Sequence, residues 1–105
     1  MKVVFKNREL EYIYEFGDEP GKPKFPPEVV KGFIRKINLL LDIKSTAELR
    51  LFKGARYEKL SGNLKGFESI RINDQFRIIL QIRTEEQNDS SEEVAFIFDI
   101  TDYHK

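Results

Sequence analysis

Hydrophobic residues in the first half of the chain recur mainly at helical spacing. A β-branched and aromatic run over residues 3–5 predicts a short opening strand. A first helix is predicted between Asn7, whose side chain can cap free backbone amides, and Gly17, which can end it. Its apolar positions are Leu10, Ile13 and Phe16. After the proline-rich stretch 18–27, a second helix carries an apolar stripe made of Val30, Phe33, Ile34, Ile37, Leu40 and Leu41.

The second half changes to the two-residue spacing of strands. Residues 45–48 fit a capping box, which predicts a brief turn of helix ending near residue 51. Apolar and polar residues then alternate over 67–72 and 76–83, and the polar residues between them predict a hairpin. A third strand is expected over 94–101, with Val94, Phe96, Phe98 and Ile100 on one face. This order predicts an α+β fold, a small antiparallel sheet with two N-terminal helices packed on one face.

Length and composition favour one soluble domain. At 105 residues the chain is expected to form a single domain over residues 1–105, because so short a chain cannot divide its core. Hydrophobic residues make up 40% and charged residues 34%, which excludes a disordered or fibrous protein. No apolar run reaches the roughly 18 residues of a membrane span, and the charged N-terminus does not resemble a signal peptide. We therefore expect a cytoplasmic protein.

Charge is unevenly distributed although the formal net charge is zero. Between Arg50 and Arg83 eight basic residues stand against three acidic ones, whereas residues 84–99 contain six acidic residues and no basic one. A solvated, highly charged loop explains most of the acidic run without any function. The basic segment is therefore the more informative of the two.

Two arginines are predicted to share an exposed face of the hairpin. If Ile70 and Ile78 face the helices, then Arg71 and Arg77 both project from the opposite side of the sheet. Arginine suits phosphate because its planar group can donate two parallel hydrogen bonds, and a fixed cation can stabilise charge that develops during phosphodiester cleavage. A surface pair held by carboxylates is an equally good explanation of these two residues alone.

The chain's single histidine, His104, lies in the closing Asp102-Tyr103-His104 triplet. Histidine and tyrosine can transfer protons near neutral pH, although a terminal histidine is more often simply solvated. Alternation along the last strand puts Tyr103 on the face of the two arginines and puts Asp102 and His104 on the other face. The strand must therefore end or twist before His104 if all of these groups are to meet.

Other site classes are not supported by the sequence. One histidine and no cysteine leave no convincing zinc site, and the carboxylates show no metal-binding spacing. A glycine-rich phosphate loop and a serine in a nucleophile elbow are also absent. We expect no metal and no cofactor.

Three blocks, at residues 60–66, 69–78 and 102–104, occur in an order that resembles the HigB-type toxins of the RelE superfamily. The resemblance covers nearly the whole chain. It implies a toxin of a type II toxin–antitoxin system that cleaves messenger RNA on the ribosome without a metal, the 2′-hydroxyl of the message attacking the adjacent phosphate. It also implies a helix-turn-helix antitoxin as partner.

The resemblance assigns roles to individual residues. Arg77 would stabilise the charged phosphate, while Asp102, Tyr103 and His104 would supply proton transfer and orientation. Arg71 would hold phosphate or ribosomal RNA. Lys59 and Lys65 are candidates for contacts to the RNA backbone, which orient a protein without reading sequence.

The chain departs from the family at two positions. Some members carry a histidine and a lysine where this chain has Glu58 and Ser61. Glu58 can act as a substitute base, or it can simply pair with Lys59 or Arg56. A catalytically impaired module that binds an antitoxin or the ribosome without cleaving RNA is therefore the alternative function, and a plain RNA-binding domain is disfavoured by the zero net charge.

Overall fold

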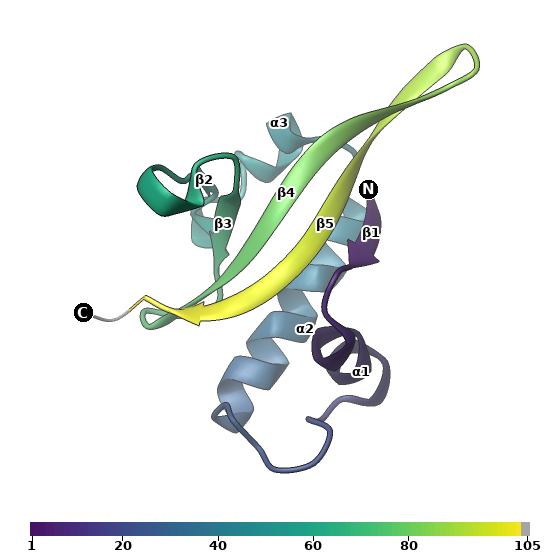
Figure 1. Cartoon of the computed structure of the whole chain (residues 1–105). Coiled ribbons are helices and arrows are strands. Elements are labelled where there is room, and N and C mark those ends of the chain that lie inside the picture. The colour runs from purple at the N-terminus through teal and green to yellow at the C-terminus, as the bar shows by residue number, and fades with distance from the viewer. Residues whose placement is uncertain (104–105) are drawn as a thin grey trace.

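A five-stranded sheet organises the molecule in the computed structural model, which describes residues 1–103 (Figure 1). The strands lie in the order β1-β5-β4-β3-β2. Their bounds are β1 Lys2–Phe5, β2 Glu58–Lys59, β3 Glu68–Arg71, β4 Phe76–Gln87 and β5 Ser90–Asp102. The predicted α+β fold is confirmed, but β1 pairs with β5 in parallel, so the sheet is not purely antiparallel. The chain between β1 and β5, which holds the helices and the other three strands, is long enough to allow this parallel pairing.

The helices begin and end where local capping dictates. They are α1 (Arg8–Phe16), α2 (Pro27–Asp42) and the short α3 (Thr46–Leu49), with two 3-10 turns, η1 (Lys53–Ala55) and η2 (Gly62–Leu64). Asn7 caps α1 by accepting from the backbone amides of Glu9 and Leu10 at 3.0 and 3.3 Å. Gly17 ends it in the left-handed conformation, at φ +80°. None of these helices is long and apolar enough to cross a membrane, as far as residues 1–103 are concerned.

The core lies between α1, α2 and one face of the sheet. Its fully buried side chains include Ile13, Phe33, Ile37, Leu40, Ile70, Ile78, Leu80 and Ile97. Two predicted core positions are wrong, since Phe16 is 65% and Leu41 45% exposed. Phe16 stacks on Tyr12 outside the core, with ring centroids 4.6 Å apart. Leu41 lies in the last turn of α2, where Leu40 takes the buried position instead.

The predicted acidic loop is wrong, because β4 and β5 continue through it as a two-stranded ribbon that projects beyond the rest of the sheet (Figure 1). Only Asn88 and Asp89 connect the two strands, and Asn88 adopts the left-handed conformation that asparagine tolerates, at φ +49°. We call residues 84–93 the acidic ribbon. Its poor strand formers, chiefly glutamates, hid it from pattern-based prediction.

A β-bulge in β5 reverses which residues of this strand point towards the core. Ile79 pairs with Asp99 but Leu80 pairs with Ile97, so Phe98 is the extra residue. Ala95 and Ile97 therefore join Ile100 in the core. The prediction that Val94, Phe96, Phe98 and Ile100 share one face is wrong, because uninterrupted alternation was assumed. Beyond the bulge, towards the C-terminus, the predicted alternation holds.

Candidate functional site

Pairing between the strands gathers polar residues on the sheet face turned away from α2. Arg77 pairs with Arg71 on one side and with Thr101 on the other. Ser69 pairs with Glu58 of β2. Because neighbouring residues directly opposite each other share a face, these side chains project from the same side of the sheet. The predicted common face of Arg71 and Arg77 is confirmed.

Two hydrogen-bond acceptors fix the guanidinium group of Arg77. Its Nε donates to Oγ of Ser69 at 2.8 Å, and its Nη2 donates to the backbone carbonyl of Arg56 at 2.5 Å. Ser69 is fully buried and Arg77 is only 8% exposed. Arg56 is in the left-handed conformation, at φ +45°, which is uncommon for a residue with a side chain. A buried guanidinium with one edge occupied has few orientations left.

Two further side chains, those of Glu58 and Tyr103, lie close to the Arg77 guanidinium. Oε1 of Glu58 lies 3.8 Å from Nη2 of Arg77, and the guanidinium carbon lies 5.2 Å from the centre of the Tyr103 ring. The Tyr103 hydroxyl donates to the same Glu58 oxygen at 3.5 Å. Tyr103 is fixed by its own backbone amide, which donates to the carbonyl of Gln75 at 2.5 Å. The structure therefore brings Glu58, Arg77 and Tyr103 together, and we call them the Arg77 cluster.

Burial makes this cluster attractive to an anion. Burial lowers the pKa of Arg77; Glu58 and Tyr103 partly counteract it, and the nearby cations of Arg56 and Arg71 lower the pKa further. Arginine nevertheless stays protonated in proteins. Burial therefore leaves Arg77 with a positive charge that its surroundings stabilise less well than water would. A phosphate that reached Arg77 would supply the missing negative charge.

A shallow hollow of about 210 Å³ opens next to the cluster. It is lined by Glu58, Lys59, Leu60, Ser61, Leu64 and Tyr103. The Tyr103 ring is 42% exposed there, and a nucleic-acid base can stack on such a ring whatever its sequence. The hollow combines an aromatic residue with a residue that carries a carboxylate and one that carries a hydroxyl. This combination suits a nucleotide better than a purely apolar ligand.

Asp102 of the predicted triplet projects from the sheet face opposite to that of Arg77. Asp102 pairs with Phe76, on the side of the strand opposite to Tyr103, and accepts from Nε2 of Gln75 at 3.0 Å. This agrees with the alternation expected from the sequence. The prediction for His104 lies outside the described residues.

The predicted RNA-contacting residues are spread around the cluster. Arg71 shares its face with Arg77 and forms an ion pair with Asp74 in the hairpin turn. Lys59 pairs with Glu68, so its side chain leaves β2 on the opposite side from Glu58. Lys65 is exposed directly after η2. Of the three, only Arg71 lies on the same sheet face as Arg77.

Sequence comparison shows the family. A family model described as the RelE-like toxin of type II toxin–antitoxin system HigB matches residues 3–93. Toxin HigB-1 of Vibrio cholerae serotype O1 is 38% identical over 81 residues, which cover 77% of this chain and 83% of that protein. The chain belongs to the HigB family of RelE-like toxins. The resemblance found in the sequence blocks is thereby confirmed.

Solved structures share the fold with this HigB-family chain. A YoeB/ParE toxin from Agrobacterium tumefaciens aligns with a TM-score of 0.52 and 15% identity, covering 99% of this chain and 100% of that one. The YoeB-YefM complex from Staphylococcus aureus gives a TM-score of 0.50 and 22% identity, covering 100% and 98% of the two chains. At such low identity these matches support the RelE-like fold alone.

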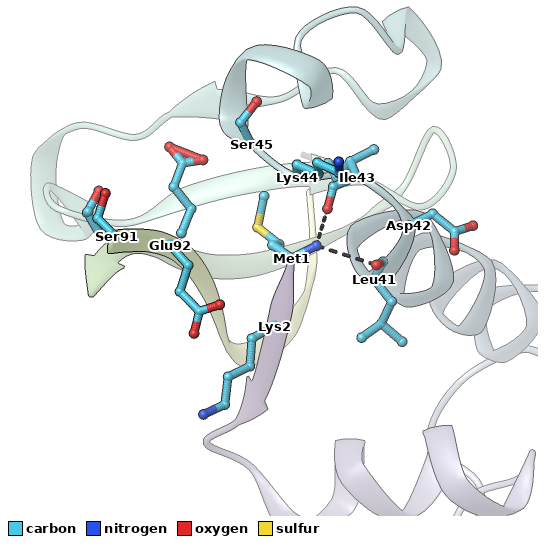
Figure 2. Close-up of a pocket in the computed structure, with 11 residues that line it drawn as sticks. Met1, Lys2, Leu41, Asp42, Ile43, Lys44, Ser45, Ser91 and Glu92 are labelled. Atoms are coloured by element: carbon cyan, nitrogen blue, oxygen red, sulfur yellow. Dashed lines mark hydrogen bonds between the residues drawn. The ribbon is translucent and has the colours of Figure 1, made fainter. Parts of the chain in front are cut away.

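A larger hollow of the HigB-family chain has a volume of about 770 Å³, and no residue of the Arg77 cluster lines it. Figure 2 shows the residues that line it. It lies between the end of α2, the start of β1 and the acidic ribbon. The Met1 amino group donates to the carbonyls of Leu40 at 2.7 Å and Leu41 at 3.4 Å, and also to that of Ile43. A cation at the carboxyl end of a helix is a stabilising arrangement. These contacts give the hollow a structural role, and we do not assign chemistry to it.

Ser69 and the Arg56 carbonyl are the contacts that sequence reasoning missed. Ser69 could have been suspected, since alternation places it on the same sheet face as Arg71 and Arg77. The Arg56 carbonyl could not, because every residue has a carbonyl and only the folded backbone decides where it points.

Proposed function

We propose that this HigB-family toxin is a metal-independent, ribosome-dependent endoribonuclease that cleaves messenger RNA. The observation that carries the proposal is the Arg77 cluster, which joins a buried cation, a carboxylate and a phenol beside an open hollow. Such a set can bind a phosphate, accept a proton and contact a base. Family membership adds the toxin context.

The proposed reaction needs a base, a cation and an acid. Glu58 accepts the proton of the ribose 2′-hydroxyl, whose oxygen then attacks the adjacent phosphorus. Arg77 stabilises the negative charge that grows on the phosphate oxygens. The bond from phosphorus to the 5′-oxygen breaks, and that oxygen takes up a proton. The products are a 2′,3′-cyclic phosphate and a free 5′-hydroxyl.

The resemblance to the family assigns proton transfer and orientation to the closing triplet, which in this proposal serves the leaving 5′-oxygen. Tyr103 touches both Arg77 and Glu58 and therefore orients the base and contacts the substrate. Asp102 and His104 supply proton transfer and orientation in this proposal. A positioned acid or base of this kind contributes roughly 10²- to 10⁴-fold in rate.

The ribosome is proposed to present the message. With zero net charge the free protein has little general attraction for RNA, so an mRNA held in place by another particle is a better substrate than naked RNA. Arg71, Lys59 and Lys65 would contact RNA backbone phosphates in this complex. The proposed place of action is the cytoplasm, where translation occurs.

The proposed partner is a cognate antitoxin. The family is described as the toxin of a type II toxin–antitoxin system, and a related fold is described in the YoeB-YefM complex. By resemblance to HigB-type systems, the antitoxin is a helix-turn-helix protein. Co-expression of the adjacent gene product and co-purification test this pairing.

Translation of a defined message tests the proposed activity. Purified protein should create new RNA ends only when ribosomes are present, with 5′-hydroxyl and 2′,3′-cyclic phosphate termini. The absence of new ends would contradict the endoribonuclease. If the protein cleaved no RNA but co-sedimented with ribosomes, the result would favour the catalytically impaired binding module.

A further inference from the structure

We infer that Ser69 is a positioning residue for the phosphate-binding guanidinium of Arg77, an inference that rests on the proposed function. Ser69 touches no substrate in this account. It acts by fixing which edge of the Arg77 guanidinium is turned towards the open side of the sheet. Two hydrogen bonds of the Arg77 guanidinium and the burial of both side chains support this role.

The guanidinium group presents distinct hydrogen-bonding edges. Arg77 uses Nε and Nη2, which form one edge, to reach Ser69 and the Arg56 carbonyl. A phosphate that binds through two parallel hydrogen bonds can then use the Nη1–Nη2 edge. The Ser69 hydroxyl therefore selects the edge that is left for the substrate.

Burial makes the selection rigid. Ser69 is fully buried and Arg77 is 8% exposed, so water cannot easily replace the serine as the acceptor for Nε. Without the hydroxyl, the Nε–H would lack its partner and the side chain would gain other orientations. A cation that is displaced by even about 1 Å from its productive position can cost on the order of 10²-fold in rate.

The Arg56 carbonyl completes the clamp but cannot replace the serine. It contacts Nη2, and one acceptor alone leaves the guanidinium free to rotate about that contact. Arg56 lies immediately after η1 in a left-handed conformation, which is what aims its carbonyl. The two acceptors, from different segments, together define the plane of the group.

A double-mutant cycle tests whether Ser69 acts through Arg77. Single-turnover cleavage on ribosomes is measured for the wild type, Ser69→Ala, Arg77→Ala and the double variant. Ser69→Ala should lower the rate about 10- to 100-fold without changing ribosome affinity. In the Arg77→Ala background the same change should have less than about a twofold further effect. Ser91→Ala, on the exposed acidic ribbon, is the matched control and should cut normally.

Two results would overturn the inference. One is a Ser69→Ala variant that cuts at the wild-type rate. The other is an equal loss in both backgrounds, which would mean a general structural role. Ser69→Thr keeps the hydroxyl and should recover most of the activity if its extra methyl is accommodated, as judged by an unchanged melting temperature.

Nuclear magnetic resonance tests the inference without cleavage. The Nε–H signal of Arg77, assigned by its disappearance in Arg77→Lys, should exchange with water at least about tenfold more slowly than that of an exposed arginine such as Arg8. Equal exchange rates in the wild type would reject the clamp even if the protein is a nuclease. A protected Arg77 in a protein that never cleaves RNA would instead reject the proposed function and leave the clamp standing.

Discussion

At the scale of single residues, the notable feature is that Arg77 is both buried and positioned before any substrate arrives. Burial lowers its pKa, which means that the protein environment stabilises the charge less well than water does. The Glu58 carboxylate, 3.8 Å away, compensates only in part. A phosphate that binds Arg77 would then share this cation with Glu58. The Glu58 carboxylate would therefore lie next to the ribose 2′-hydroxyl that it is proposed to deprotonate.

Glu58→Gln separates catalysis from simple ion pairing. The amide keeps the shape of the side chain but cannot accept the 2′-hydroxyl proton, so cleavage should fall about 10²- to 10⁴-fold. Single-turnover rates on ribosomes measure this effect. Glu86→Gln, on the acidic ribbon, is the control. A Glu58→Gln variant that cuts at the wild-type rate would remove Glu58 from the mechanism.

Residue parity explains how far the sequence could predict this site. Arg71, Arg77 and Tyr103 were placed on one face because alternation is reliable within a short, regular segment of strand. The position of Glu58 depended on the two-residue strand β2, which is too short to show any period. The Arg56 carbonyl depended on one left-handed residue, and no side-chain pattern encodes that.

At the scale of elements, helix α2 and strand β3 approach each other closely at Gly32. A Cβ atom at this position would lie 2.7 Å from Cγ2 of Ile72, which is shorter than real contacts of this kind. The glycine therefore allows the helix to pack directly on the end of β3, the strand that carries Ser69 and Arg71. The distance between helix and sheet is set by a residue whose helix propensity is poor.

Gly32→Ala should destabilise the protein despite its better helix propensity. Overpacking costs about 1–3 kcal/mol, which exceeds the gain of roughly 1 kcal/mol expected in an open helix. Urea unfolding measures the change. Gly54→Ala is the control, since nothing lies within 4 Å of the added atom and the backbone there is not left-handed. A Gly32→Ala variant at least as stable as the wild type would show that the helix can shift freely.

The acidic ribbon is an element that carries an internal repulsion. Glu85 lies directly opposite Glu92 across the two strands, and like charges in this arrangement are destabilising. The ribbon forms nonetheless, because its strands continue from the well-packed sheet and share its register. Polar strands of this kind escape detection in a sequence, since their pairing is imposed by the strands from which they extend.

Glu85→Lys should tighten the acidic ribbon. Replacing the repulsive pair by an attractive one is expected to contribute about 0.2–1 kcal/mol to local stability. Amide hydrogen exchange over residues 84–93 should slow accordingly. Glu86→Lys makes the same charge change opposite Ser91 and should have a smaller effect. Equal effects of both substitutions would mean that net charge, rather than the cross-strand pair, governs the ribbon.

At the scale of the whole molecule, opposite charges are separated along one long hairpin. The dimensions are 45 × 29 × 25 Å, and the ribbon accounts for much of the elongation (Figure 1). From Arg77 to the tip at Gln87 the strand covers about 33 Å, at roughly 3.3 Å per residue. The glutamates of the acidic ribbon, which lie at or beyond the Thr84–Glu93 pair, are thus at least about 23 Å, or roughly three screening lengths, from Arg77 at physiological salt. They do not oppose RNA binding there.

The Arg77 cluster is proposed to cleave RNA, and a comparison of two arginine variants tests this role. Message ends are mapped on translating ribosomes with the wild type, Arg77→Ala and Arg83→Ala. Arg83 lies on the same strand and stacks on Phe96, so it matches the charge change away from the cluster. We predict new 5′-hydroxyl ends with the wild type and Arg83→Ala, and a loss of about 10²- to 10³-fold with Arg77→Ala. Undiminished cleavage by a folded Arg77→Ala protein would contradict the account.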